Sequence, residues 1–221
     1  MKIPAADDKL RARKIIKVIR KRYPEATTAL THSSPLDILI ATILSAQCTD
    51  RQVNLVTDEL FRRYKTARDY AGANRAELER IIRPTGFYHA KAKNVIACCK
   101  ALQERYNGIV PQTMEELIQL PGVGRKTANV VLGNYFGKAV GIVVDTHVKR
   151  ISGRLGFTTN TDPVKIESDL MKIIPEKYWI DFGNIIIEHG RDTCKARKPL
   201  CHACPVNNYC PSEKIYRNTG K

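Results

Sequence analysis

The stretch Leu120-Pro121-Gly122-Val123-Gly124-Arg125-Lys126-Thr127-Ala128 lies between two short segments with helical apolar spacing. Glycines at alternate positions, Gly122 and Gly124, let the backbone turn tightly and bring amide N–H groups close to a ligand. The second helix is expected to begin at about Arg125, so that its free N–H groups face outward and suit a phosphate. Most short glycine-rich turns only join packed helices, but the neighbouring Arg125 and Lys126 favour phosphate binding. On the residues alone, Lys126 is a further phosphate-binding side chain.

Helical periodicity extends outward from this turn over almost the whole chain. Apolar residues recur every three or four positions, and Gly and Pro mark the breaks. The β-branched stretch 140–144 stands alone and is interpreted as an extended, buried connection. The sequence therefore predicts an all-α chain of short helices. The expected helices are Lys9–Tyr23, Pro35 to about Ala46, Arg51–Tyr64, Arg75–Ile82, Lys91–Tyr106, Met114–Gln119, Arg125–Phe136, Thr146–Leu155, Pro163–Ile174 and Tyr178–Gly190.

The chain of 221 residues carries a formal net charge of +15 at pH 7. Such a surplus implies a polyanionic partner, because Lys and Arg neutralise phosphates and release condensed counterions. Charge alone also fits a basic ribosome-associated or structural protein. No apolar run is long enough to cross a bilayer, and the N-terminus has no apolar signal segment. We therefore expect the protein to stay in the cytoplasm.

The cysteines give the most specific signal in the chain. Disulfides are rare in the cytoplasm, and clustered thiolates converge on one metal centre more readily than they pair across a fold. Only one pair has the spacing of a zinc knuckle, and four thiolates fit a [4Fe–4S] cluster equally well. His202 is expected to be a bystander, and Cys98 and Cys99 are interpreted as buried helix residues. The clustered cysteines, separated by six, two and five residues, are Cys194, Cys201, Cys204 and Cys210.

Asp145 follows the apolar run and directly precedes the helix expected from Thr146. Aspartate is among the best N-cap residues, so capping alone explains it. A carboxylate that emerges from an apolar segment also supports a positive charge well, since screening is weak there. His147 either orients Asp145 or only packs nearby.

The chain resembles the endonuclease III family of base-excision DNA glycosylases. Its hairpin, Asp145 segment and cysteine spacing follow one another in the order typical of that family. The resemblance covers the chain from about Pro35 to Cys210. It implies that Lys126, two residues beyond the last hairpin glycine, is the catalytic nucleophile. It also implies that Asp145, nineteen residues later, assists loss of the damaged base and stabilises the cationic sugar, a role compatible with capping.

The same resemblance implies two α-helical lobes with a DNA-binding cleft between them. Residues 29–139 would form a six-helix lobe that contains the helix-hairpin-helix. Residues 1–28 and 140–221 would form the other lobe, which carries a [4Fe–4S] cluster on the four clustered cysteines. The cluster would be structural and would hold a basic loop, including Arg197 and Lys198, against the DNA backbone.

Two further loops resemble the segments that fill the gap left when a base is taken out of the DNA stack. Gln47 would bond to the orphan base, and Phe87 would act as an aromatic wedge where the best-known bacterial relative has leucine. Two simpler interpretations stay open: Gln47 as a hydrogen-bonding residue at a helix end, and Phe87 as a core residue.

The function that this resemblance implies is a bifunctional DNA glycosylase and abasic-site lyase. It would act as a monomer on double-stranded DNA with damaged bases or abasic sites, at the nucleoid of a prokaryotic cell. It would remove oxidised pyrimidines and cleave the strand 3′ to the abasic site by β-elimination. A monofunctional mismatch or adenine glycosylase shares the scaffold, but such relatives generally lack the hairpin lysine. A non-enzymatic zinc-dependent DNA-binding module is a further alternative.

Overall fold

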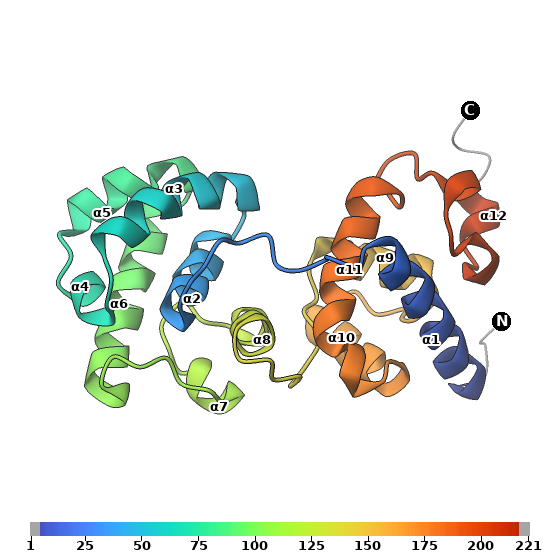
Figure 1. Cartoon of the computed structure of the whole chain (residues 1–221), viewed down its shortest axis with the longest axis horizontal. Helices are drawn as coiled ribbons and strands as arrows, with labels where there is room; N and C mark the ends of the chain where they lie inside the picture. Colours follow the sequence, from blue (N-terminus) through green and yellow to red (C-terminus); the bar gives the residue numbers. More distant parts are fainter. Residues whose placement is uncertain (1–4, 217–221) are drawn as a thin grey trace. The chain divides into compact units, whose positions relative to one another are not determined.

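The computed structural model describes residues 5–216, and the regular elements in that part of the chain are all helices (Figure 1). The all-α prediction is therefore confirmed. The chain divides into two compact units. Unit 2 comprises Thr28–Lys138, and unit 1 combines the chain up to Thr27 with the chain from Ala139 onward. Each unit buries an apolar core of its own.

Unit 2 begins its helical part with α2 (Pro35–Leu44), which is buried on most sides. Ser34 caps this helix in a reciprocal capping box with Asp37, and Pro35 occupies the first turn, where its missing N–H costs nothing. The other helices of the unit are α3 (Asp50–Arg63), α4 (Ala67–Ala71), α5 (Arg75–Ile82), the 3₁₀ turn η1 (Arg83–Thr85), α6 (Tyr88–Tyr106), α7 (Met114–Leu117) and α8 (Arg125–Asn134).

Two helices of unit 2 differ from the prediction by more than two residues at an end. The short helix α4 was not expected; a Thr66–Asp69 capping box starts it, and its Tyr70 is fully buried and stacks on Tyr64. Helix α6 begins at Tyr88 rather than Lys91, because the tight turn at Phe87 leads straight into it. Apolar periodicity reports neither difference: the capping box of α4 is a local polar signal, and the start of α6 depends on the geometry of the preceding turn.

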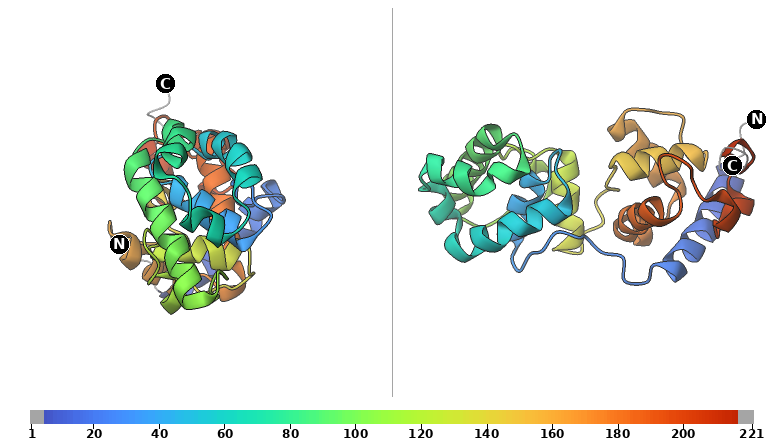
Figure 2. Two further views of the ribbon diagram at one scale, coloured as in Figure 1. Left: turned by 90° about the vertical axis from the view of Figure 1, so that its left-hand side faces the viewer. Right: turned by 90° about the horizontal axis from the view of Figure 1, so that it is seen from above.

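Unit 1 is built around α11 (Trp179–Asp192), which contacts α1 (Ala5–Arg22) and α9 (Thr146–Arg154). In the right-hand view of Figure 2, α1 and α9 lie on different sides of α11. The isoleucines of α1 lie in the core, as its amphipathic pattern predicts. The remaining elements are α10 (Pro163–Ile173), α12 (Glu213–Tyr216) and the 3₁₀ turns η2 (Glu176–Tyr178), η3 (Cys201–Ala203) and η4 (Asn207–Tyr209).

The connection that leads into α9 is extended without being a strand, as predicted. Ile142 and Val144 are buried in the core of unit 1. Val140, in contrast, is 37% exposed, so the expected burial of the whole stretch is wrong at its first residue. None of the helices within residues 5–216 is both long and apolar enough to span a membrane.

Candidate functional site

The hairpin between α7 and α8 requires glycine at Gly122. Its φ of +76° lies in the left-handed region, where a side chain is strained. A Cβ at this position would also lie 2.8 Å from the Cβ of Asn94 on α6. The turn is closed by the Val123 N–H, which donates to the Leu120 carbonyl oxygen at 3.1 Å. The hairpin is thus held closely against α6.

The N-terminus of α8 follows this turn and is not capped by a side chain. Gly124 is its N-cap residue, and the first turn holds no acidic residue that would offset the helix dipole. Arg125 and Lys126 in that turn are exposed. Within residues 5–216 the Lys126 ammonium has no hydrogen bond and no ion pair. The turn therefore offers backbone donors suited to a phosphate and an amine free to react.

Asp145 is the N-cap residue of α9, in unit 1. Its Oδ1 accepts the Val148 N–H at 2.8 Å, and its Oδ2 lies 3.0 Å from His147 Nδ1. The Asp145 side chain is 17% exposed, so it is screened from bulk water without being closed off. His147 in turn packs against α11, where a Cβ on Gly190 would meet its ring at 2.8 Å. The structure thus brings Asp145 and His147 together, and His147 fixes one carboxylate oxygen.

The two residues expected to fill the gap in DNA share an unusual backbone conformation. Gln47 has a φ of +52° and Phe87 a φ of +47°, and both side chains are exposed. Non-glycine residues with positive φ are uncommon and concentrate at functional sites. Lys198 in the basic loop and Asn107 at the end of α6 also have positive φ. Phe87 is 67% exposed, which rules out the core interpretation.

The four clustered cysteines line a single cavity of about 30 Å³ in unit 1. Its volume exceeds the 10–15 Å³ or so that one water needs. No three His, Cys, Asp or Glu side chains of residues 5–216 are placed to hold a single metal ion. All four cysteine residues nevertheless line the same space. Four cysteines around one space suit a cluster that takes one thiolate at each iron. His202 is exposed and does not line the cavity.

Two arginines of α9 fix the start of the cysteine loop. Arg154 Nη1 lies 3.3 Å from Cys194 Sγ and donates to the Lys195 carbonyl oxygen at 2.7 Å, while its Nη2 donates to the Ala196 carbonyl oxygen at 2.9 Å. Arg150 Nη2 donates to the Cys194 carbonyl oxygen at 3.1 Å. The exposed Arg197 and Lys198 lie in the loop that begins here.

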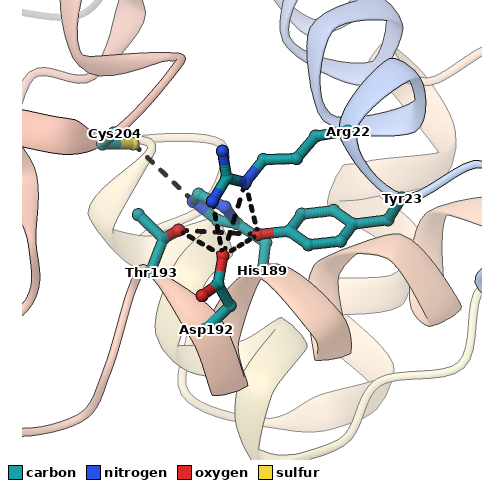
Figure 3. A network of polar contacts seen from close by, with 6 residues as sticks. All are labelled: Arg22, Tyr23, His189, Asp192, Thr193 and Cys204. Carbon is teal, nitrogen blue, oxygen red and sulfur yellow. Dashed lines mark hydrogen bonds and ion pairs between the residues drawn. The ribbon is translucent and has the colours of Figure 1, made fainter.

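A polar network ties this loop to the end of α1 (Figure 3). Asp192 Oδ2 accepts from Tyr23 Oη at 2.7 Å and from Arg22 Nη2 at 2.9 Å, and these bonds lower the pKa of Asp192 to about 2. The His189 ring behind it is 2% exposed, and burial lowers its pKa to about 4. His189 Nε2 lies 3.7 Å from Cys204 Sγ. A neutral imidazole thus packs directly on the cysteine site.

The predicted residues consequently fall into separate groups. Unit 1 carries Asp145 with His147, and also the four cysteines with the basic loop. Unit 2 carries the hairpin with Lys126, and the turns of Gln47 and Phe87. Sequence reasoning missed Arg154 and His189, because only the fold brings them to the cysteines. The clustered thiols signalled a site, but no local spacing pointed to these two neighbours.

Two family models match the chain. The model described as HhH-GPD superfamily base excision DNA repair protein matches residues 40–176. The model described as iron-sulfur binding domain of endonuclease III matches residues 194–210, the segment that begins and ends at the outer cysteines. The chain carries a [4Fe–4S] cluster, and the four cysteines that line one cavity are the residues that would hold it as thiolates. Burial raises the pKa of the free Cys204 thiol to about 11.

Individual relatives are similar over nearly the whole chain. Endonuclease III of Synechocystis is 53% identical over 94% of both chains, and that of Escherichia coli is 39% identical over 94% of this chain and 99% of its own. A solved structure of a non-covalent endonuclease III–DNA complex has a TM-score of 0.88 at 45% identity, covering 94% of this chain and 97% of its own. A trapped endonuclease III–DNA covalent intermediate has a TM-score of 0.90 at 44% identity, covering 95% of this chain and 99% of its own. The chain belongs to the endonuclease III family, base excision repair DNA glycosylases with abasic-site lyase activity that carry a [4Fe–4S] cluster.

Proposed function

We propose that Lys126 is the nucleophile of this glycosylase and lyase. The observation that carries the proposal is the free Lys126 amine in the first turn of the uncapped helix α8. An amine of this kind becomes a nucleophile once its proton is removed. It adds to the sugar C1′ of an extruded nucleotide while the damaged base leaves with the electron pair of the glycosidic bond. The adduct opens to an imine, a proton leaves C2′, and the 3′ phosphate departs as the strand is cut.

Asp145 acts on the same nucleotide as the second catalytic residue. Its carboxylate helps to deprotonate Lys126 and stabilises the positive charge that develops on the sugar. Oδ1 is occupied by the cap bond to the Val148 N–H. Oδ2, which His147 orients from 3.0 Å, is therefore the oxygen that faces the sugar.

The remaining residues hold the DNA. Gly122, Gly124 and Arg125 bind a phosphate at the hairpin, and Arg197 and Lys198 bind the backbone from the basic loop. Gln47 and Phe87 enter the space that the extruded base leaves. The substrate is double-stranded DNA with oxidised pyrimidines or abasic sites, and the protein works as a monomer at the nucleoid of a prokaryotic cell.

Borohydride trapping tests the nucleophile. It reduces the imine, so the protein should become covalently attached to DNA that contains a defined oxidised pyrimidine. The Lys126→Ala variant should give no adduct, while the Lys100→Ala variant, changed at an exposed lysine in the middle of α6, should be trapped like the unchanged protein. Full trapping of Lys126→Ala would refute the assignment. Release of the base without an adduct or strand cleavage would indicate a monofunctional mismatch or adenine glycosylase instead.

A further inference from the structure

Lys91 is a buried lysine that the proposed chemistry does not use. It lies in the first turn of α6 and is 4% exposed. Burial lowers the pKa of its ammonium, and the nearby Cys48 thiol raises that pKa by less. A buried cation is costly unless partners replace its water, and a cation in the first turn of a helix opposes the helix dipole. Global stability therefore gives no reason for a lysine at this position.

The Lys91 side chain reaches back to the turn that carries Phe87. Its Nζ donates to the Thr85 carbonyl oxygen at 2.8 Å, and its backbone N–H donates to the Phe87 carbonyl oxygen at 3.0 Å. Thr85 is itself buried, and its Oγ1 donates to the Ile82 carbonyl oxygen at 2.8 Å. One residue thus holds the carbonyl groups on both sides of Gly86.

This turn needs such support because its conformation is strained. Gly86 and Phe87 both have positive φ, at +70° and +47°, and Phe87 caps α6 without any side-chain hydrogen bond. Residues held in sparsely populated backbone regions persist only where the surrounding structure over-determines them. In the relaxed backbone, the exposed Phe87 ring would no longer have a fixed direction.

The same ammonium also lies near the other gap-filling turn. Cys48, whose thiol acts electrostatically on Lys91, directly follows Gln47. Cys48 also packs against the core of unit 2. Lys91 therefore interacts with a residue in or beside each of the two segments proposed to enter the DNA.

We infer that Lys91 is a positioning residue: by holding the Thr85 carbonyl, it keeps the Phe87 ring directed outward for insertion into the gap left by an extruded base. This inference rests on the proposed role of Phe87. Since Lys91 is buried and does not touch the substrate, it acts only through the turn.

The Lys91→Met variant tests the inference, with Lys100→Met as the matched control on the exposed face of the same helix. Methionine keeps the length and apolar stem of lysine but removes the ammonium. Single-turnover base excision should fall about 10-fold, within the range of roughly 5- to 150-fold that one lost base–aromatic stack corresponds to. The thermal midpoint should change little, because removal of the buried charge offsets the lost hydrogen bond to the Thr85 carbonyl. Hydrogen exchange at the Gly86 amide should become faster.

The double variant Lys91→Met/Phe87→Ala separates this inference from the role of Phe87. If Lys91 acts through the ring, Lys91→Met should cause no further loss once Phe87 is alanine. A wild-type rate for Phe87→Ala would overturn the wedge role itself. Two outcomes would overturn only the inference about Lys91. In the first, Phe87→Ala lowers the excision rate but Lys91→Met does not. In the second, Lys91→Met lowers the rate equally whether residue 87 is phenylalanine or alanine.

The Lys91→Gln variant adds a rescue experiment. Its amide N–H can still donate to the Thr85 carbonyl, so excision should recover partly relative to Lys91→Met. Fluorescence of 2-aminopurine beside the lesion should follow the same order, because it reports base extrusion directly. Loss of helical circular dichroism in both variants would also overturn the inference, since it would show that Lys91 supports the core and not the turn.

Discussion

Asp145 has two proposed roles, capping α9 and stabilising charge on the sugar, and substitution can separate them. Asn and Asp cap helices about equally well, whereas alanine loses the bond that Val148 N–H now makes at 2.8 Å. We expect Asp145→Ala to lower the free energy of unfolding by about 1 kcal/mol. Asp145→Asn should cost only the loss of a charge near the helix N-terminus, about 0.3–1 kcal/mol, since the first turn of α9 has no other acidic residue.

Base excision should respond differently from stability. Both variants remove the negative charge, so both should lower the single-turnover excision rate by roughly 10²- to 10³-fold, the size of effect measured when a preorganised charge-stabilising group is removed. The two rates should be similar although the two stabilities differ. The assay is single-turnover excision of a defined oxidised pyrimidine, followed alongside urea unfolding of each variant.

Asp162 supplies the matched control. It caps α10 in the same unit, where its carboxylate accepts the Lys165 N–H at 3.0 Å. Asp162→Ala should lose about as much stability as Asp145→Ala, about 1 kcal/mol, yet excise at the unchanged rate. A wild-type excision rate in Asp145→Asn would refute the catalytic role and leave Asp145 as a cap alone.

Three further outcomes are expected. Gly122→Ala should lose about 1–3 kcal/mol of stability and bind DNA more weakly, because its φ is positive and its Cβ would lie 2.8 Å from the Asn94 Cβ. Gly124→Ala is the control: its φ is negative and a Cβ would meet open space, so this variant should keep its denaturation midpoint. Arg154→Met should lose the visible iron–sulfur absorbance faster than the unchanged protein in mild denaturant, because three polar contacts to the cysteine loop disappear. An equal rate of absorbance loss would show that Arg154 does not stabilise this loop. Iodoacetamide should not modify Cys98 in the native protein at pH 8, because the thiol is buried and burial raises its pKa to about 12. Mass spectrometry would detect the modified cysteine, and rapid modification would contradict this burial.

Most helices could be predicted from local patterns. The sequence prediction for Arg75–Ile82 matches α5 at both ends, where apolar spacing and the Asn74 cap agree. The helix beginning at Pro35 was also predicted, because proline suits a first turn and the following residues are apolar on most sides. The start of α1 was placed too late, since Ala5 to Asp8 precede the apolar stripe that carried the prediction.

The sequence by itself determined the chemistry that short spacing encodes: the cysteines that form a metal site, the glycines that form a hairpin before a lysine, and the aspartate that caps a helix. Only the tertiary structure decided how these features are supported. Lys91 and Arg154 look like ordinary surface cations in the sequence, yet one is buried under the Phe87 turn and the other holds the cysteine loop. Their roles depend on contacts with elements outside their own helical pattern, and on positive φ angles that arise when packing outweighs local backbone preference.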